Sequence, residues 1–351
     1  MTSIKTYQLK VKEVIKETAQ AISIVFDNSK DKIQYRSGQF ITLNLTIDGQ
    51  KVKRSYSLSS SAFTESDLIV CVKSVDNGLV SNYLNKNIKA GDIVEIDEPM
   101  GHIKVIPENK PRTILLFAAG SGITPIFSII KTILTKEQHS KVHLFYGCRN
   151  RDEIIYQKEL EKYQNQFSDR FSLEYVMSQP DDFWVGLNGR INEKLAIHFI
   201  KRHAALTAKD CQYYMCGPTG MMDGILKALD LLEIPKNQVF KENFHLKEEN
   251  SVVDIISAAV SGKSKVKVID GKKTYEFEVA QNETILSVAQ KLGYGLPYSC
   301  QAGMCTACMG KCTTGKVRMT EADGLTDNEI KQGYVLTCVG HPDAAEVVIE
   351  L

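Results

Sequence analysis

The fold is decided by the stretch Thr113-Ile-Leu-Leu-Phe-Ala-Ala-Gly-Ser-Gly-Ile-Thr-Pro125. It begins as an uninterrupted apolar run and is then broken by two glycines and a proline. This order predicts a buried strand, a glycine turn and the start of a helix, because proline is favoured in the first helical turn. Two more apolar runs, 142–146 and 212–216, each lead into a helix-like segment. Strands that alternate with helices predict a parallel sheet covered on both faces, an α/β domain.

The first hundred residues carry a different pattern. Polar and apolar residues alternate in short runs at 7–11, 40–45 and 67–72. Turn signals such as Asp48-Gly49 separate these runs. Regularly spaced short strands predict an antiparallel β-barrel or sandwich.

The carboxyl-terminal part follows a polar segment that is typical of a linker. Two strand-like runs, 266–269 and 274–279, flank the hairpin signal Asp270-Gly271, so a small α+β domain is expected. The predicted boundaries are 1–106 for the barrel, 107–247 for the parallel-sheet domain, 248–264 for the linker and 265–351 for the α+β domain.

Length and charge exclude several classes of protein. The chain has 351 residues, enough for two or three domains at roughly 150 residues each. It has 43 Lys and Arg against 42 Asp and Glu, and so a net charge of +1. Nucleic-acid binding is not expected, because neutralising phosphates requires clustered excess cations. No signal peptide or membrane span is apparent, so a cytoplasmic location without a membrane partner is expected.

Cysteine spacing points to an iron–sulfur site. Five of the nine cysteines lie after residue 299, and a disulfide framework is not expected in a cytosolic chain of this size. Cys300, Cys305 and Cys308 follow the C-x4-C-x2-C spacing of plant-type [2Fe–2S] centres, with Cys338 farther along the chain. We expect these four cysteines to be the metal ligands and Cys312 to be a bystander. A zinc site is the alternative, since Cys305 and Cys308 alone would fit one.

Three segments of the first domain carry groups that suit a flavin. In Arg54-Ser55-Tyr56-Ser57 a guanidinium can bind a pyrophosphate, a phenol ring can cover a flat heteroaromatic and a hydroxyl can bond its polar edge. Cys71-Val72-Lys73 follows, and Gly78-Leu79-Val80-Ser81 opens a helix-like segment whose N–H groups can bind phosphate.

Together these segments resemble the flavin barrel of the ferredoxin–NADP reductase superfamily. The resemblance covers 3–106 and implies FAD, with FMN as an alternative. It places Ser57 near the flavin N5, where hydride arrives. The residues implied to line the flavin are Arg54, Tyr56, Ser57, Val72, Lys73, Gly78, Leu79, Val80 and Ser81.

Two motifs of the second domain suit a nicotinamide dinucleotide. The helix start at Gly120, Gly122, Thr124 and Pro125 forms an anion site for a pyrophosphate. Cys216-Gly217-Pro218 follows another strand, at the edge where open sheets bind ligands. In the same superfamily this pair of motifs holds NAD(P) with the cysteine close to the nicotinamide. A buried core thiol is the alternative for Cys216.

Coenzyme choice and the end of this domain depend on four more residues. Arg149 and Arg151 can pair with a 2′-phosphate, which favours NADPH, although the acidic residues beside them leave NADH possible. The superfamily places an acid and an aromatic near the flavin at the end of this domain, and Glu242 and Phe244 match those positions. The expected catalytic residues are therefore Ser57, Cys216 and Glu242.

The order of the three parts resembles a known kind of electron-transfer protein. Residues 266–351 resemble a plant-type ferredoxin, which implies a β-grasp fold. The whole chain resembles the family of reductase components of bacterial phenylacetyl-CoA epoxidases. That resemblance implies an NAD(P)H-dependent oxidoreductase that passes electrons from NADPH to FAD, to [2Fe–2S] and then to a di-iron epoxidase in phenylacetate degradation. Another oxygenase, a desaturase or a hydroxylase as recipient stays open, as does a non-catalytic redox-sensing or zinc-binding module.

Overall fold

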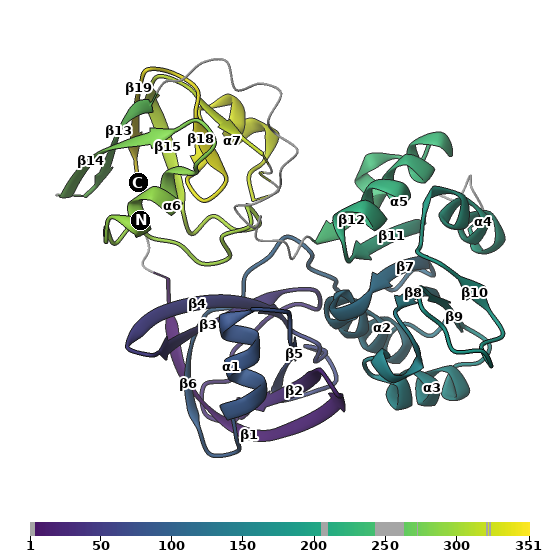
Figure 1. The fold of residues 1–351 in the computed structure, drawn as a ribbon. Coiled ribbons are helices and arrows are strands. Elements are labelled where there is room, and N and C mark those ends of the chain that lie inside the picture. The colour runs from purple at the N-terminus through teal and green to yellow at the C-terminus, as the bar shows by residue number, and fades with distance from the viewer. Residues whose placement is uncertain (1–3, 205–209, 243–262, 272, 321, 323) are drawn as a thin grey trace. The chain divides into compact units, whose positions relative to one another are not determined.

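The computed structural model describes residues 4–204, 210–242 and 263–351, apart from 272, 321 and 323. The chain divides into two compact units (Figure 1). One unit spans Thr6–Phe244, and the other comprises His245–Leu351 with Met1–Lys5. No helix within the described ranges combines the length and apolar character needed to cross a membrane.

The first part of the larger unit is an antiparallel barrel, as the alternating pattern predicts. Its six strands lie in the order β4-β3-β6-β1-β2-β5. The two end strands meet through a bridge between Leu58 and Val70, which closes the sheet on itself. Helix α1 (Leu79–Asn87) follows β5. The strands are β1 (Thr6–Thr18), β2 (Ala21–Phe26), β3 (Phe40–Ile47), β4 (Gln50–Ser57), β5 (Leu68–Lys73) and β6 (Ile93–Asp97).

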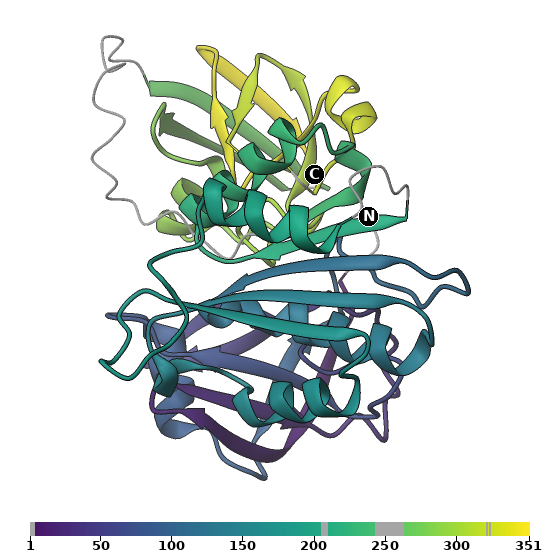
Figure 2. The same cartoon turned by 90° about the vertical axis from the view of Figure 1, so that its right-hand side faces the viewer.

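The second part of this unit is a parallel six-stranded sheet with the order β10-β9-β8-β7-β11-β12. Helices α2 (Ile123–Lys136) and α3 (Gln157–Gln166) cover one face (Figures 1 and 2). Helices α4 (Glu193–His203) and α5 (Thr219–Leu231) cover the other. The strands are β7 (Thr113–Ala119), β8 (Lys141–Cys148), β9 (Phe171–Met177), β10 (Leu187–Asn188), β11 (Cys211–Cys216) and β12 (Val239–Glu242).

Strand order in this sheet identifies a ligand-binding edge. From β7 the chain runs through α2 to β8 on one side, and it later returns to β11 on the other side. In open α/β sheets such a switch leaves a crevice at the carboxyl ends of the two central strands. Both predicted dinucleotide motifs follow β7 and β11, so they lie at this crevice.

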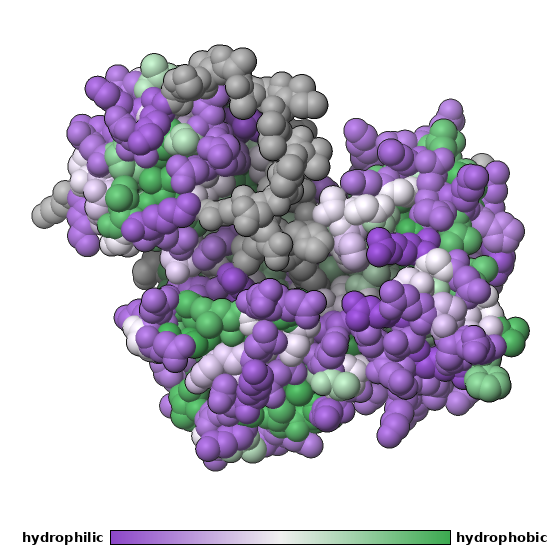
Figure 3. Space-filling view, in the orientation of Figure 1, coloured by the Kyte–Doolittle hydropathy of each residue, from purple (hydrophilic) through white to green (hydrophobic). Residues whose placement is uncertain are grey.

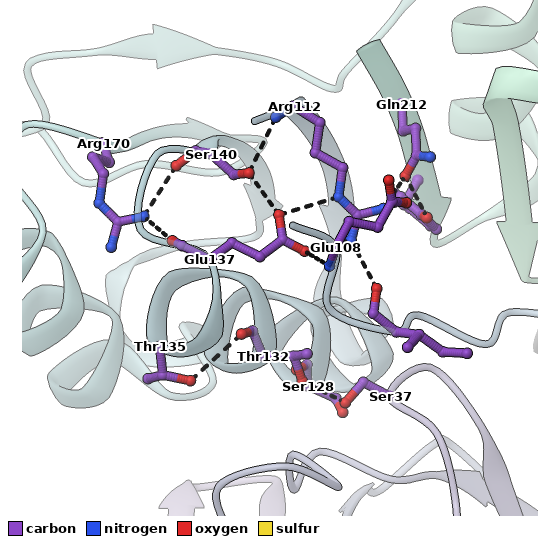
Figure 4. A network of polar contacts seen from close by, with 12 residues as sticks. Ser37, Glu108, Arg112, Ser128, Thr132, Thr135, Glu137, Ser140, Arg170 and Gln212 are labelled. Atoms are coloured by element: carbon purple, nitrogen blue, oxygen red, sulfur yellow. Dashed lines mark hydrogen bonds and ion pairs between the residues drawn. The ribbon is translucent and has the colours of Figure 1, made fainter. Parts of the chain in front are cut away.

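A buried ion pair anchors the segment that joins the barrel to the sheet (Figure 4). Arg112 Nη2 lies 2.7 Å from Glu137 Oε1, and the two side chains are only 5% and 2% exposed. Arg112 also donates to the carbonyl of Ile106 and the carboxylate of Glu108. The network therefore fixes the connection between the two parts against the end of α2.

The smaller unit is a mixed α+β fold. Its main sheet has the order β14-β13-β19-β15-β17, with β13 parallel to β19, and β16 pairs with β18 in a second sheet. The predicted hairpin at Asp270-Gly271 joins β13 to β14. The elements are β13 (Lys263–Asp270), β14 (Lys273–Ala280), α6 (Ile285–Lys291), β15 (Met309–Thr314), β16 (Val317–Met319), α7 (Asp327–Lys331), β17 (Tyr334–Leu336), β18 (Gly340–Pro342) and β19 (Glu346–Glu350).

Strand β13 begins at Lys263, where it pairs with Ala280, so the last two residues of the predicted linker 248–264 lie in this strand. The remaining part of that prediction, 248–262, lies outside the described residues.

Candidate functional site

The three residues predicted to be catalytic meet in one buried place. Cys216 ends β11 and pairs in register with Glu242 on the neighbouring strand β12. Ser57, the last residue of β4, donates a hydrogen bond of 3.2 Å from its Oγ to Glu242 Oε2. All three are at most 3% exposed. Burial and the charge of Glu242 raise the pKa of Cys216 well above its usual value, so this side chain stays a neutral thiol.

The turns at Gly120–Gly122 and at Gly217 approach one another closely, and we call this pair of turns the dinucleotide cradle. A Cβ on Gly122 would lie 2.1 Å from the carbonyl oxygen of Cys216, and one on Gly217 would lie 3.2 Å from the Cβ of Ala119. Gly120 has φ +54°, a left-handed conformation that favours glycine. The backbones at the ends of β7 and β11 therefore approach one another closely. The N-terminus of α2 lies at this edge, and the start of a helix favours an anion.

Other residues of these motifs stabilise the turns and the helix starts that follow them. The Thr124 hydroxyl donates to the Ser121 carbonyl at 2.8 Å and is buried, so it fastens the turn. Pro125 lies in the first turn of α2, as expected. Pro218 is the N-cap of α5, and its carbonyl accepts from the Met221 N–H at 2.9 Å.

The flavin-motif residues divide into accessible and buried side chains. Arg54 and Tyr56 are partly exposed on β4. Gly78 caps α1, and a Cβ there would lie 2.5 Å from the Oγ of Ser81, so a larger residue would require that side chain to move. Val72 and Val80 point into the barrel core instead, where they support the site without facing solvent. Leu79, by contrast, is half exposed.

A carboxylate outside the predicted set of site residues joins two of the predicted sites. Glu153 Oε2 lies 2.7 Å from Lys73 Nζ, and its Oε1 lies 3.1 Å from Arg149 Nη1. Burial opposes ionisation, but the hydrogen bond and charge of Lys73 together with Arg149 lower the pKa of Glu153. The spacing of Arg149 and Glu153 was visible in the sequence, whereas the pairing with Lys73 bridges the barrel and the sheet domain.

The predicted metal ligands gather around one loop. Cys300 and Cys305 have their sulfur atoms 3.2 Å apart, and the Cys338 thiol interacts with those of Cys300 and Cys308. The Ala302 N–H donates to Cys300 Sγ at 3.4 Å. Hydrogen bonds from Cys305 and Cys338 lower the pKa of Cys300 below its usual value, which favours the thiolate form of this side chain.

Backbone conformation explains how this loop closes. Gln301 and Gly303 have φ values of +55° and +71°, so the chain turns sharply between the first two cysteines. Among the described residues, no group of three metal-binding side chains is arranged to hold a single ion. Cys312, the predicted bystander, lies in β15, and its thiol donates to the Thr314 carbonyl at 3.3 Å.

Phe244, which was predicted to lie near the flavin, is outside the described residues.

Three domain families match the chain. They are the oxidoreductase FAD-binding domain over 6–105, the oxidoreductase NAD-binding domain over 116–227 and the 2Fe-2S iron-sulfur cluster binding domain over 268–343. The matches cover the flavin motif, both dinucleotide motifs and all four clustered cysteines. FAD, a nicotinamide dinucleotide and a [2Fe–2S] cluster are thus the cofactors of this oxidoreductase.

Curated relatives span nearly the full length of the chain. The ferredoxin reductase component of 3-ketosteroid-9-alpha-monooxygenase from Rhodococcus rhodochrous is 34% identical over 97% of this chain and 96% of its own. A component of the 1,2-phenylacetyl-CoA epoxidase of Escherichia coli is 31% identical over 98% and 97%. Phthalate dioxygenase reductase has the same fold, with a TM-score of 0.63 at 21% identity over 99% and 98% of the two chains. The chain therefore belongs to the ferredoxin–NADP reductase superfamily, in the family whose members carry a C-terminal plant-type [2Fe–2S] domain.

Proposed function

We propose that this protein is the NADPH-dependent reductase component of an oxygenase system, and that it passes electrons from NADPH through FAD and [2Fe–2S] to the oxygenase. The observation that carries the proposal is the meeting of Ser57, Cys216 and Glu242 where the flavin motif and the end of β11 converge. When bound, the flavin accepts two electrons as hydride and gives them up singly, and the cluster carries one at a time.

The chain's own residues prepare this place for hydride transfer. The Cys216 thiol stays neutral, so it places no charge at the end of the dinucleotide cradle. Ser57 is oriented by its hydrogen bond to Glu242 and keeps its lone pairs to accept from a ligand.

The proposed recipient is the phenylacetyl-CoA epoxidase. Support comes from the Escherichia coli relative, a component of that epoxidase that matches the whole chain. The relative from a steroid monooxygenase is slightly more similar, so that oxygenase is the competing recipient. Adding the purified protein to each oxygenase in turn and measuring product per NADPH consumed would decide between them.

The relay itself is tested by a full-length chain that lacks the cluster. In Cys305→Ser one of the four clustered thiols is lost, and we expect iron and sulfide content to fall. The variant should still reduce ferricyanide with NADPH but should not support the oxygenase. Cys312→Ser is the matched control, because its thiol bonds to a strand carbonyl away from the loop, and it should retain the cluster and both activities. Oxygenase turnover by Cys305→Ser at the wild-type rate would contradict the proposed order of carriers.

A further inference from the structure

The loop that joins β9 to β10 lies at the edge of the dinucleotide-binding sheet. Beyond the two strands the pairing of β8 with β9 continues, because Ser178 donates to the Cys148 carbonyl at 2.9 Å and Gln179 donates to the Arg149 carbonyl at 2.8 Å. The loop 181–187 therefore begins beside the turn that follows β8. In a sheet with this strand order, a dinucleotide whose nicotinamide end lies between β7 and β11 extends its adenosine end toward β8 and β9.

This loop is built around a tryptophan. The Trp184 Nε1 donates to the Leu187 carbonyl at 3.2 Å, and its backbone N–H donates to the Asp181 carbonyl at 3.1 Å. A Cβ on Gly186 would lie 2.5 Å from the indole ring, so the loop folds closely over it. Phe183 and Val185 are 85% and 94% exposed, and hydrophobic atoms protrude at this end of the sheet in Figure 3.

The loop holds the guanidinium of Arg151 in place. The Arg151 Cζ lies 5.4 Å from the Trp184 ring centroid, and its Nη2 donates to the Phe183 carbonyl at 3.3 Å. Its acidic neighbour is Asp181, whose Oδ2 is 3.7 Å from Nε, and both side chains are about half exposed. An exposed pair at this distance is weak, so a phosphate dianion can compete for the guanidinium.

Arg149 is held in a different way. Its partner Glu153 is only 14% exposed and also binds Lys73 at 2.7 Å, so the carboxylate is fixed between two cations. Arg149 itself is 54% exposed, but its Nη1 is bound to a carboxylate that is fixed between two cations, so a phosphate that approached this guanidinium would meet the charge of Glu153. The two arginines that follow β8 are therefore not equivalent.

We propose that Arg151 binds the 2′-phosphate of NADPH, with Trp184 as its positioning residue, and that Arg149 instead fastens the turn through Glu153. This inference rests on the proposed use of NADPH. A planar guanidinium that lies over an aromatic ring and is bonded to a backbone carbonyl loses little further freedom when its remaining N–H groups bind a phosphate in a bidentate way. The loop 181–187 then belongs to the coenzyme site and determines its specificity.

Trp184 is the only tryptophan of the chain, so its fluorescence reports on this subsite directly. Titrating the full-length protein with 2′,5′-ADP should change the fluorescence, and 5′-AMP should bind at least tenfold more weakly. Arg151→Gln should raise the Kd for 2′,5′-ADP roughly tenfold or more, the loss expected for a charged hydrogen bond. Arg149→Gln, the matched variant two residues away, should raise it less.

A second measurement separates a positioning role from a merely structural one. In Trp184→Leu the ratio of kcat/KM for NADPH to that for NADH should fall, while the flavin content stays that of the wild type. If Arg149→Gln weakens 2′,5′-ADP binding more than Arg151→Gln does, the assignment of the phosphate ligand is wrong. If the wild type binds 2′,5′-ADP and 5′-AMP equally well, the proposed use of NADPH is wrong, whichever arginine faces the coenzyme.

Discussion

Replacing Arg112 by methionine should destabilise the flavin–nicotinamide unit strongly. The change keeps an unbranched stem but removes the guanidinium, so the Glu137 carboxylate, 2% exposed, is left without its cation. The Glu108 N–H at 2.9 Å and the Ser140 hydroxyl at 2.6 Å remain as donors, which do not neutralise the charge (Figure 4). Removing one partner of a buried ion pair costs about 3–5 kcal/mol. At roughly 2–4 °C per kcal/mol, the melting temperature should fall by about 6–20 °C.

A matched exposed pair provides the control for this prediction. Arg202 Nη1 also lies 2.7 Å from a carboxylate, that of Glu174, but these side chains are 48% and 26% exposed. Arg202→Met should therefore cost only about 0.2–1 kcal/mol. The assay is the release of flavin fluorescence on heating the holoprotein, which reports on the unit that binds the flavin. Equal melting temperatures for the two variants would refute the reasoning that burial, and not distance, decides the cost.

Three further predictions concern the cradle, the Cys216 thiol and the partly buried His143. Gly122→Ala would place a Cβ 2.1 Å from the Cys216 carbonyl and should slow flavin reduction by NADPH at least tenfold, whereas Gly220→Ala, with no atom within 4 Å of its Cβ, should not. Cys216→Ala leaves unfilled space at a fully buried position beside the dinucleotide turn, so flavin reduction should slow in stopped-flow measurements while the flavin content stays unchanged, and an unchanged rate would contradict the proposed place of Cys216 in the site. Burial and the charges of His203 and Lys141 lower the pKa of His143 to about 4, below its ordinary value of 6.5. The unfolded chain therefore binds a proton between these pH values that the folded chain does not, so stability should fall as pH drops from about 6.5 to about 4. His143→Gln should flatten that dependence of melting temperature on pH.

The fold could be predicted from the sequence because its signals are local. The apolar run at 114–118 matches β7, and Asp270-Gly271 makes the hairpin that such a pair favours. The cluster loop was equally visible, since three of its four cysteines lie within nine residues. Contacts between distant segments were not visible. The hydrogen bond between Lys73 and Glu153 joins residues 80 positions apart, and no periodicity or spacing in the sequence predicts it.

Hydroxyl groups on α2 set the position of the nicotinamide cradle relative to the flavin motif. Thr132 Oγ1 donates to the Ser128 carbonyl at 3.0 Å and lies 2.6 and 2.8 Å from the hydroxyls of Ser37 and Ser61. A hydroxyl has a single proton, so both serines must donate to it. Ser61 belongs to the segment that directly follows Ser57, and the same helix begins at the dinucleotide turn. Apolar packing alone is non-directional, whereas these hydrogen bonds are directional and so favour the observed alignment of the helix against the barrel. The position of Ser57 at the end of β11 therefore depends in part on Thr132, Ser37 and Ser61. These are small polar residues, and a search of the sequence for apolar periodicity does not single them out.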